Sequence, residues 1–76
     1  MSAKWRIRAD ALDEARRMHG FTSDEKLAAE LGMSGTAVRS LRRGITSPSI
    51  ATLMKLRRLT GIPVEALVRE EKPIAA

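Results

Sequence analysis

Cysteine is missing from this chain of 76 residues, and aromatic side chains are rare, since only Trp5 and Phe21 occur. Without cysteine the chain can form neither a disulfide framework nor a thiolate metal site, and we expect a cytoplasmic protein in a reducing compartment. The scarcity of aromatic rings argues against a module that stacks the bases of single-stranded RNA. No apolar run approaches the roughly 20 residues that span a bilayer, so we expect no membrane contact and no signal peptide.

Carboxylates are missing from the interval between Glu30 and Glu65, in a chain whose formal net charge is +5. Such a block of one sign raises a positive potential that attracts a polyanion such as nucleic acid, although a solvated basic face is the commoner outcome of a charge run. The cationic residues in this interval are Arg39, Arg42, Arg43, Lys55, Arg57 and Arg58.

The length suits a single domain that buries only about 60% of the surface of its unfolded chain. No internal repeat, low-complexity segment or convincing strand divides the sequence. We assign residues 1–69 to one domain and residues 70–76, with their glutamates and proline, to a flexible C-terminal tail.

Apolar residues with a period of 3.6 predict a first helix over residues 4–19, which ends at Gly20. We expect Trp5 to cover the edge of the core and His19 to place a favourable charge at the helix end. The basic residues near its start either lie on a solvated face or reach a phosphate or the minor groove as an N-terminal arm. The apolar stripe is Ile7, Ala11, Leu12, Ala15 and Met18, and the basic residues are Lys4, Arg6 and Arg8.

Capping residues and glycines predict four further helices. The first runs to about Leu31, the second covers residues 34–43, the third is opened by Pro48 and Ser49 and ends at Gly61, and the fourth covers residues 64–68. Thr22 and Ser23 can both cap the first of these, and Thr22 has the spacing of a capping box with Glu25. In the helix opened by Pro48 and Ser49, the residues expected to face inward are Ile50, Leu53, Leu56 and Leu59.

The spacing of small and apolar residues from Asp24 onward is that of a helix-turn-helix. Counting Asp24 as the first position, Ala28 is fifth and Gly32 ninth. A small residue is needed where the two helices cross, and glycine supplies the backbone freedom of the turn. The apolar positions that fix the crossing angle are Leu27, Leu31, Met33, Val38 and Leu41.

With a second matching segment over residues 48–67, the sequence from Ile7 to Val68 resembles the Cro/repressor-type (XRE) helix-turn-helix family. The resemblance implies an all-α fold, a compact five-helix bundle like that of lambda repressor, whose second and third helices form the helix-turn-helix. It implies a sequence-specific regulator of transcription that binds double-stranded operator DNA, similar to a phage Cro-like repressor in a bacterial or phage-infected cell. Relatives often bind palindromic sites as homodimers, and no cofactor or small-molecule ligand is implied.

The sequence departs from the family pattern at two charged positions. The family usually has a phosphate-binding glutamine where this chain has Asp24, and an aspartate would repel a phosphate. Family members often pair an arginine, here Arg16, with a glutamate at the position of Arg42. We therefore expect that internal ion pair to be missing, with Arg42 pointing outward or pairing with Glu14.

The side of the helix over 34–43 opposite its apolar residues is the expected base-reading face, at 100° per residue. Arginine can donate two parallel hydrogen bonds to guanine, and threonine can contact a thymine methyl. The predicted base-reading residues are Thr36, Arg39, Ser40 and Arg43, and the predicted phosphate-binding residues are Ser34, Gly35, Arg42, Thr46, Ser47 and Ser49. Lys55, Arg57 and Arg58 should supply only long-range attraction or solvated surface.

Three other classes of protein fit less well. An enzyme is the poorest fit, because the single histidine has no metal-ligand spacing and the sequence offers no catalytic or metal-binding set. An antitoxin, or another protein-interaction module on the same fold, would need more chain after residue 68 to wrap a partner. A basic module that binds RNA or a membrane surface would bind without preference for an operator.

Overall fold

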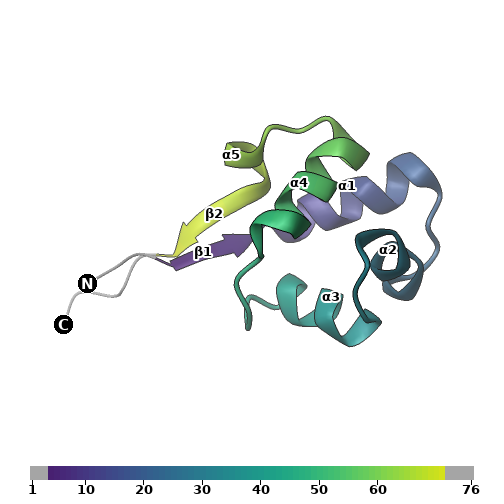
Figure 1. Ribbon diagram of the computed structural model, residues 1–76, viewed down its shortest axis with the longest axis horizontal. Coiled ribbons are helices and arrows are strands. Elements are labelled where there is room, and N and C mark those ends of the chain that lie inside the picture. Colours follow the sequence, from purple (N-terminus) through teal and green to yellow (C-terminus); the bar gives the residue numbers. More distant parts are fainter. Residues whose placement is uncertain (1–3, 72–76) are drawn as a thin grey trace.

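The computed structural model describes residues 4–71, which form a short antiparallel ribbon and five helices. The ribbon extends to one side of the helical body, and both ends of the described chain lie at its tip (Figure 1). The all-α expectation therefore holds only approximately, because the fold is mostly helical with one two-stranded sheet. In chain order the elements are β1 (Lys4–Ile7), α1 (Ala9–His19), α2 (Asp24–Leu31), α3 (Gly35–Arg42), α4 (Ile50–Thr60), α5 (Val64–Leu67) and β2 (Val68–Glu71).

Serine hydroxyls fix the start of α2, α3 and α4. The Oγ atoms of Ser23, Ser34 and Ser49 accept hydrogen bonds from the N–H groups of the residues three positions later, at 3.3, 3.1 and 3.1 Å. Each bond satisfies an N–H group that has no partner within the helix. The expected capping box between Thr22 and Glu25 is wrong, because Ser23 is the cap and the Glu25 side chain binds α3 instead.

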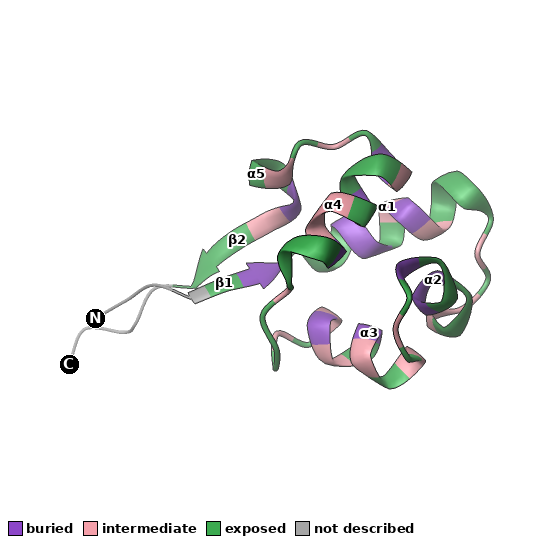
Figure 2. Ribbon diagram, in the orientation of Figure 1, coloured by how far each residue is buried: buried purple, intermediate pink, exposed green. Residues whose placement is uncertain are grey.

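The core lies where α1, α2, α3 and α4 meet (Figure 2). Ile7 of β1 and Leu67 of α5 also belong to it and are fully buried. Two expected core residues lie outside it. Ile50 is 79% exposed because it starts α4, and Thr52 is buried instead, where its hydroxyl accepts a hydrogen bond from Ser49. Met18 is half-exposed at the end of α1. The buried apolar residues are Ile7, Ala11, Leu12, Ala15, Leu27, Ala28, Leu31, Val38, Leu41, Leu56 and Leu67.

The ribbon replaces the expected first turns of the first helix. The prediction of helix from Lys4 is wrong: residues 4–7 are strand β1, paired antiparallel with β2 so that Ile7 faces Val68 and Lys4 faces Glu71. Residues 70 and 71, predicted as tail, belong to β2, and the rest of that tail lies outside the described residues. Trp5 is on β1 with 51% of its surface exposed, so it covers little of the core.

None of the helices within residues 4–71 has both the length and the apolar character that a membrane span requires.

Candidate nucleic-acid interface

The turn between α2 and α3 presents α3 at the edge of the molecule (Figure 1). Gly32 adopts φ +71°, a left-handed conformation that side chains disfavour, and the next N–H, of Met33, donates to the Ala28 carbonyl at 2.9 Å. Val38 and Leu41 are buried against the other helices. The opposite side of α3 is therefore left facing solvent.

The four predicted base-reading residues lie on that outer side. Thr36, Arg39 and Arg43 are exposed, and Ser40 is half-buried. α3 itself contributes no acidic residue to this side. This arrangement offers a polyanion one protruding helix with two arginines along it.

The predicted phosphate-binding residues divide between two places. Ser34 and Gly35 lie at the start of α3 beside α2, and the Ser34 hydroxyl oxygen is already used as the cap. Thr46, Ser47 and Ser49 lie together at one shallow pocket between α3 and the loop before α4, with Met33, Ala37, Leu41 and Thr52 as its other walls. Arg42 belongs to neither place.

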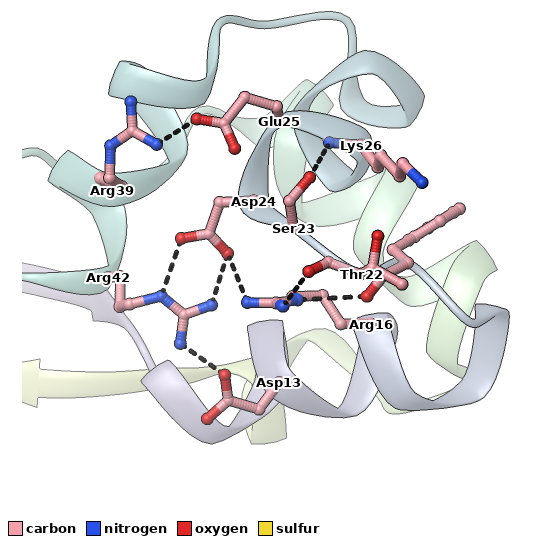
Figure 3. Close-up of polar contacts among 10 residues, drawn as sticks. Asp13, Arg16, Thr22, Ser23, Asp24, Glu25, Lys26, Arg39 and Arg42 are labelled. Carbon is pink, nitrogen blue, oxygen red and sulfur yellow. Dashed lines mark hydrogen bonds and ion pairs between the residues drawn. The ribbon is translucent and has the colours of Figure 1, made fainter.

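Arg42 turns inward, to a network centred on Asp24 (Figure 3). Arg42 donates to both Asp24 carboxylate oxygens, at 3.2 and 2.8 Å, and to Asp13 at 2.5 Å. Arg16 donates to Asp24 at 3.2 Å from the other side and also holds the Phe21 and Thr22 carbonyls. The expectation that Arg42 points outward or pairs with Glu14 is wrong, since Glu14 pairs with Arg17.

The protonation of this network follows from its geometry. The hydrogen bonds from Arg42, and then the charges of both arginines, lower the pKa of Asp24 although its partial burial opposes this. The same bonds raise the pKa of Arg42. Asp24 is thus a carboxylate with 12% of its side chain exposed, shielded by two cations, and its charge is not presented to a phosphate.

Arg39 also has an acidic neighbour, but at the surface. Its Nη1 donates to Oε1 of Glu25 at 2.5 Å, linking α3 to the first turn of α2 (Figure 3). The hydrogen bond from Arg39 lowers the pKa of Glu25. Side-chain exposure of 49% for Arg39 and 61% for Glu25 leaves both groups in water, so the pair contributes little to stability.

Comparison with known proteins settles the class of this fold. A family model described as helix-turn-helix matches residues 12–67. The chain belongs to the Cro/repressor-type (XRE) helix-turn-helix family. Searches of curated proteins and of solved structures returned no match to this chain. Membership makes it a DNA-binding regulator whose partner is double-stranded DNA.

Within this XRE fold, the Asp24 network takes the place of the arginine–glutamate pair that the family resemblance led us to expect. The chain has arginine at both former partner positions, 16 and 42, and Asp24 supplies the carboxylate between them. The sequence shows both departures separately. Only the fold shows that the aspartate at position 24 compensates for the arginine at position 42, because α1, α2 and α3 converge at this point.

Arg6 and Arg69 of the ribbon lie beside the loop before α4, a placement that the sequence does not predict. Arg6 is 8% exposed, and its Nη1 donates to Ser47 Oγ at 2.5 Å. Arg69, its partner across the ribbon, lies beside Gly44, where an added Cβ would be 3.2 Å from Arg69 Nη2. No carboxylate within residues 4–71 pairs with Arg6. Alternation over residues 4–7 is the only sequence signal for this placement, and it is short.

Lys55 has a structural contact at the end of α2. Its Nζ donates to the Leu31 carbonyl at 3.1 Å, next to Gly32, and so satisfies the end of α2. Arg57 and Arg58 are exposed in the last turn of α4. Across residues 4–71 there is no group of three or more histidine, aspartate or glutamate residues arranged to hold a metal ion.

Proposed function

We propose that this regulator is a sequence-specific, Cro-like repressor that inserts α3 into the major groove of its operator. The supporting observation is the outer side of α3, where Arg39 and Arg43 are exposed while Val38 and Leu41 are buried on the other side. The major groove admits one α-helix, and its base edges carry a pattern that distinguishes all four base pairs. Bound at a promoter, such a protein blocks access to it.

Each residue of the outer side has a contact that suits its chemistry. Arg39 and Arg43 donate to the O6 and N7 atoms of guanine. Thr36 contacts a thymine methyl or a backbone oxygen, and Ser40 bonds to either kind of acceptor. Arg39 carries the main preference, because it is the exposed arginine within α3, whereas Arg43 is the C-cap.

Phosphates on either side of the groove are held by the start of α3 and by the loop before α4. Ser34, with the N–H of Gly35, faces one strand, and helix N-termini favour anions. Thr46, Ser47 and Ser49, which line one pocket beside α3, hold the other strand. Arg42 has an indirect role, since all of its guanidinium nitrogens donate to Asp24 or Asp13 and so hold α3 in place.

Selection of duplexes from a random pool by the purified chain tests this function. We expect enrichment of one motif, and a palindromic motif would indicate a homodimer on two half-sites. Binding should weaken with salt, with a logarithmic slope of about −0.9 for each phosphate neutralised. A pool that remains random after repeated selection would refute sequence-specific binding.

Single alanine variants then assign the reading residues. Arg39→Ala should reduce discrimination at one base pair by about 5- to 150-fold. Arg57→Ala is the matched control, because it removes the same charge from an exposed site on α4. If Arg39→Ala and Arg43→Ala both retain the base preference of the parent, α3 does not read the operator through these side chains.

A further inference from the structure

Glu25 is the acidic side chain that lies closest to the outer face of α3. It stands in the first turn of α2, and its Oε1 accepts the 2.5 Å hydrogen bond from Arg39 Nη1 (Figure 3). A carboxylate near DNA phosphates opposes binding to every sequence alike. Its presence beside the main reading arginine therefore calls for a reason other than affinity.

Gly35 provides the space that the Glu25 side chain occupies. A Cβ on Gly35 would lie 2.9 Å from Glu25 Cγ, 3.0 Å from Oε1 and 3.1 Å from Cδ. The backbone does not require glycine here, because the positive-φ glycines are 20, 32, 44 and 61. Glycine at the first position of α3 thus lets the Glu25 side chain cross to Arg39.

The hydrogen bond leaves part of Arg39 open. Only Nη1 donates to Glu25, and within the described residues neither Nε nor Nη2 of Arg39 has a hydrogen-bond partner. Two parallel donors on one edge of the guanidinium are what guanine O6 and N7 accept. The Nε–Nη2 edge can therefore bind a base while Nη1 remains on Glu25.

We propose that Glu25 is a positioning residue that sets the base specificity of Arg39, with Gly35 as the gap that admits it. This rests on the proposed function, in which Arg39 reads the major groove. A free arginine side chain has many rotamers and can bind different bases, or a phosphate instead of a base. Glu25 restricts Arg39 to one direction, so it sharpens discrimination and, through its charge, lowers affinity for all duplexes.

Four variants separate positioning from charge. Glu25→Ala removes the contact, and Glu25→Gln keeps an acceptor oxygen without the charge. Gly35→Ala displaces Glu25 while leaving both side chains of the pair in place, and alanine suits a helix better than glycine, so this variant should fold. Glu30→Ala, exposed on the same helix, removes an equal charge and is the matched control.

The measurement is the affinity for the selected duplex and for duplexes changed at the base pair that Arg39→Ala identifies. Glu25→Ala and Gly35→Ala should each reduce discrimination at that pair by about three- to tenfold, and the double variant should lose no more than either single one. Both Glu25 variants and Glu30→Ala should bind every duplex at least as tightly as the parent. Glu25→Gln and Glu30→Ala should keep the discrimination of the parent.

Two failures can be told apart. If Arg39→Ala leaves the base preference unchanged, Arg39 does not read the operator. The proposed role of Glu25 is then refuted as well. If Arg39→Ala relaxes the preference while Glu25→Ala and Gly35→Ala keep full discrimination, Arg39 reads DNA without help from Glu25. That second result overturns this inference and leaves the proposed function intact.

Discussion

Replacing Asp24 with asparagine would remove the carboxylate that joins α1, α2 and α3. Asp24 accepts three hydrogen bonds from two guanidinium groups, and its side chain is only 12% exposed. Asparagine has nearly the same shape, but it offers one acceptor oxygen and turns an NH₂ group toward an arginine donor. Arg42 would keep its hydrogen bond to Asp13, and Arg16 would keep only its hydrogen bonds to the backbone carbonyls of Phe21 and Thr22.

The size of the effect follows from these contacts. A hydrogen bond between charged groups contributes about 1.5 to 3 kcal/mol, and removal of one partner from a buried pair is costlier still. The side chains of Arg16 and Arg42 are 31% and 24% exposed, so water can replace part of what is lost. We therefore expect Asp24→Asn to lower the free energy of unfolding by about 2 kcal/mol, which for a domain of this size lowers Tm by about 8 to 16 °C.

Urea unfolding followed by far-ultraviolet circular dichroism at neutral pH measures this change. Asp10→Asn is the matched control, because Asp10 also pairs with an arginine, at 3.2 Å, but its side chain is 71% exposed. We expect the control to keep the unfolding midpoint of the parent. Equal midpoints for Asp24→Asn and Asp10→Asn would refute the conclusion that the Asp24 network holds the helices together.

Three further predictions concern acid, capping and packing. The folded-state pKa of Asp24 is lowered, so the stability difference between the parent and Asp24→Asn should persist above the unfolded pKa of about 3.9 and disappear as pH falls below it. Urea titrations at several pH values measure this difference. A difference that already shrinks near neutral pH would contradict the prediction. Ser34→Ala should lower the free energy of unfolding by about 1 kcal/mol, because it removes the hydroxyl that caps α3. An unchanged midpoint of urea unfolding would mean that water caps α3 equally well. Leu12→Ala should lower the free energy of unfolding by about 2 to 5 kcal/mol, measured by thermal unfolding, because Leu12 is fully buried. Ile50→Ala, at an exposed site, should change it by no more than about 0.5 kcal/mol. Similar losses for the two variants would place Ile50 in the core.

Local signals in the sequence are sufficient to predict the helix-turn-helix. Gly32 is glycine because the turn needs a positive φ, and Ser34 is serine because the first N–H groups of α3 need an acceptor. Both requirements are met within a few residues of the chain, so they are visible without a structure. The spacing of Val38 and Leu41 likewise fixes which side of α3 faces outward.

Contacts between distant residues were not predictable in the same way. The strand over residues 4–7 forms because it pairs with 68–71, and a four-residue segment with apolar and basic positions can be read equally well as a helix start. The Arg16–Asp24–Arg42 network needs three helices to converge, so the sequence shows Asp24 and Arg42 only as two separate departures from the family pattern. Ile50 matched the inward period of its helix, but the first turn of α4 lies beyond the core.

The ribbon also affects when the interface is completed during synthesis. Its two strands come from opposite ends of the described chain, so β1 waits for its partner until almost all of the domain has left the ribosome. Arg6 and Arg69 meet beside the loop before α4 only at that stage. A chain that stopped before β2 would leave β1 without its partner strand and the space beside Gly44 without Arg69.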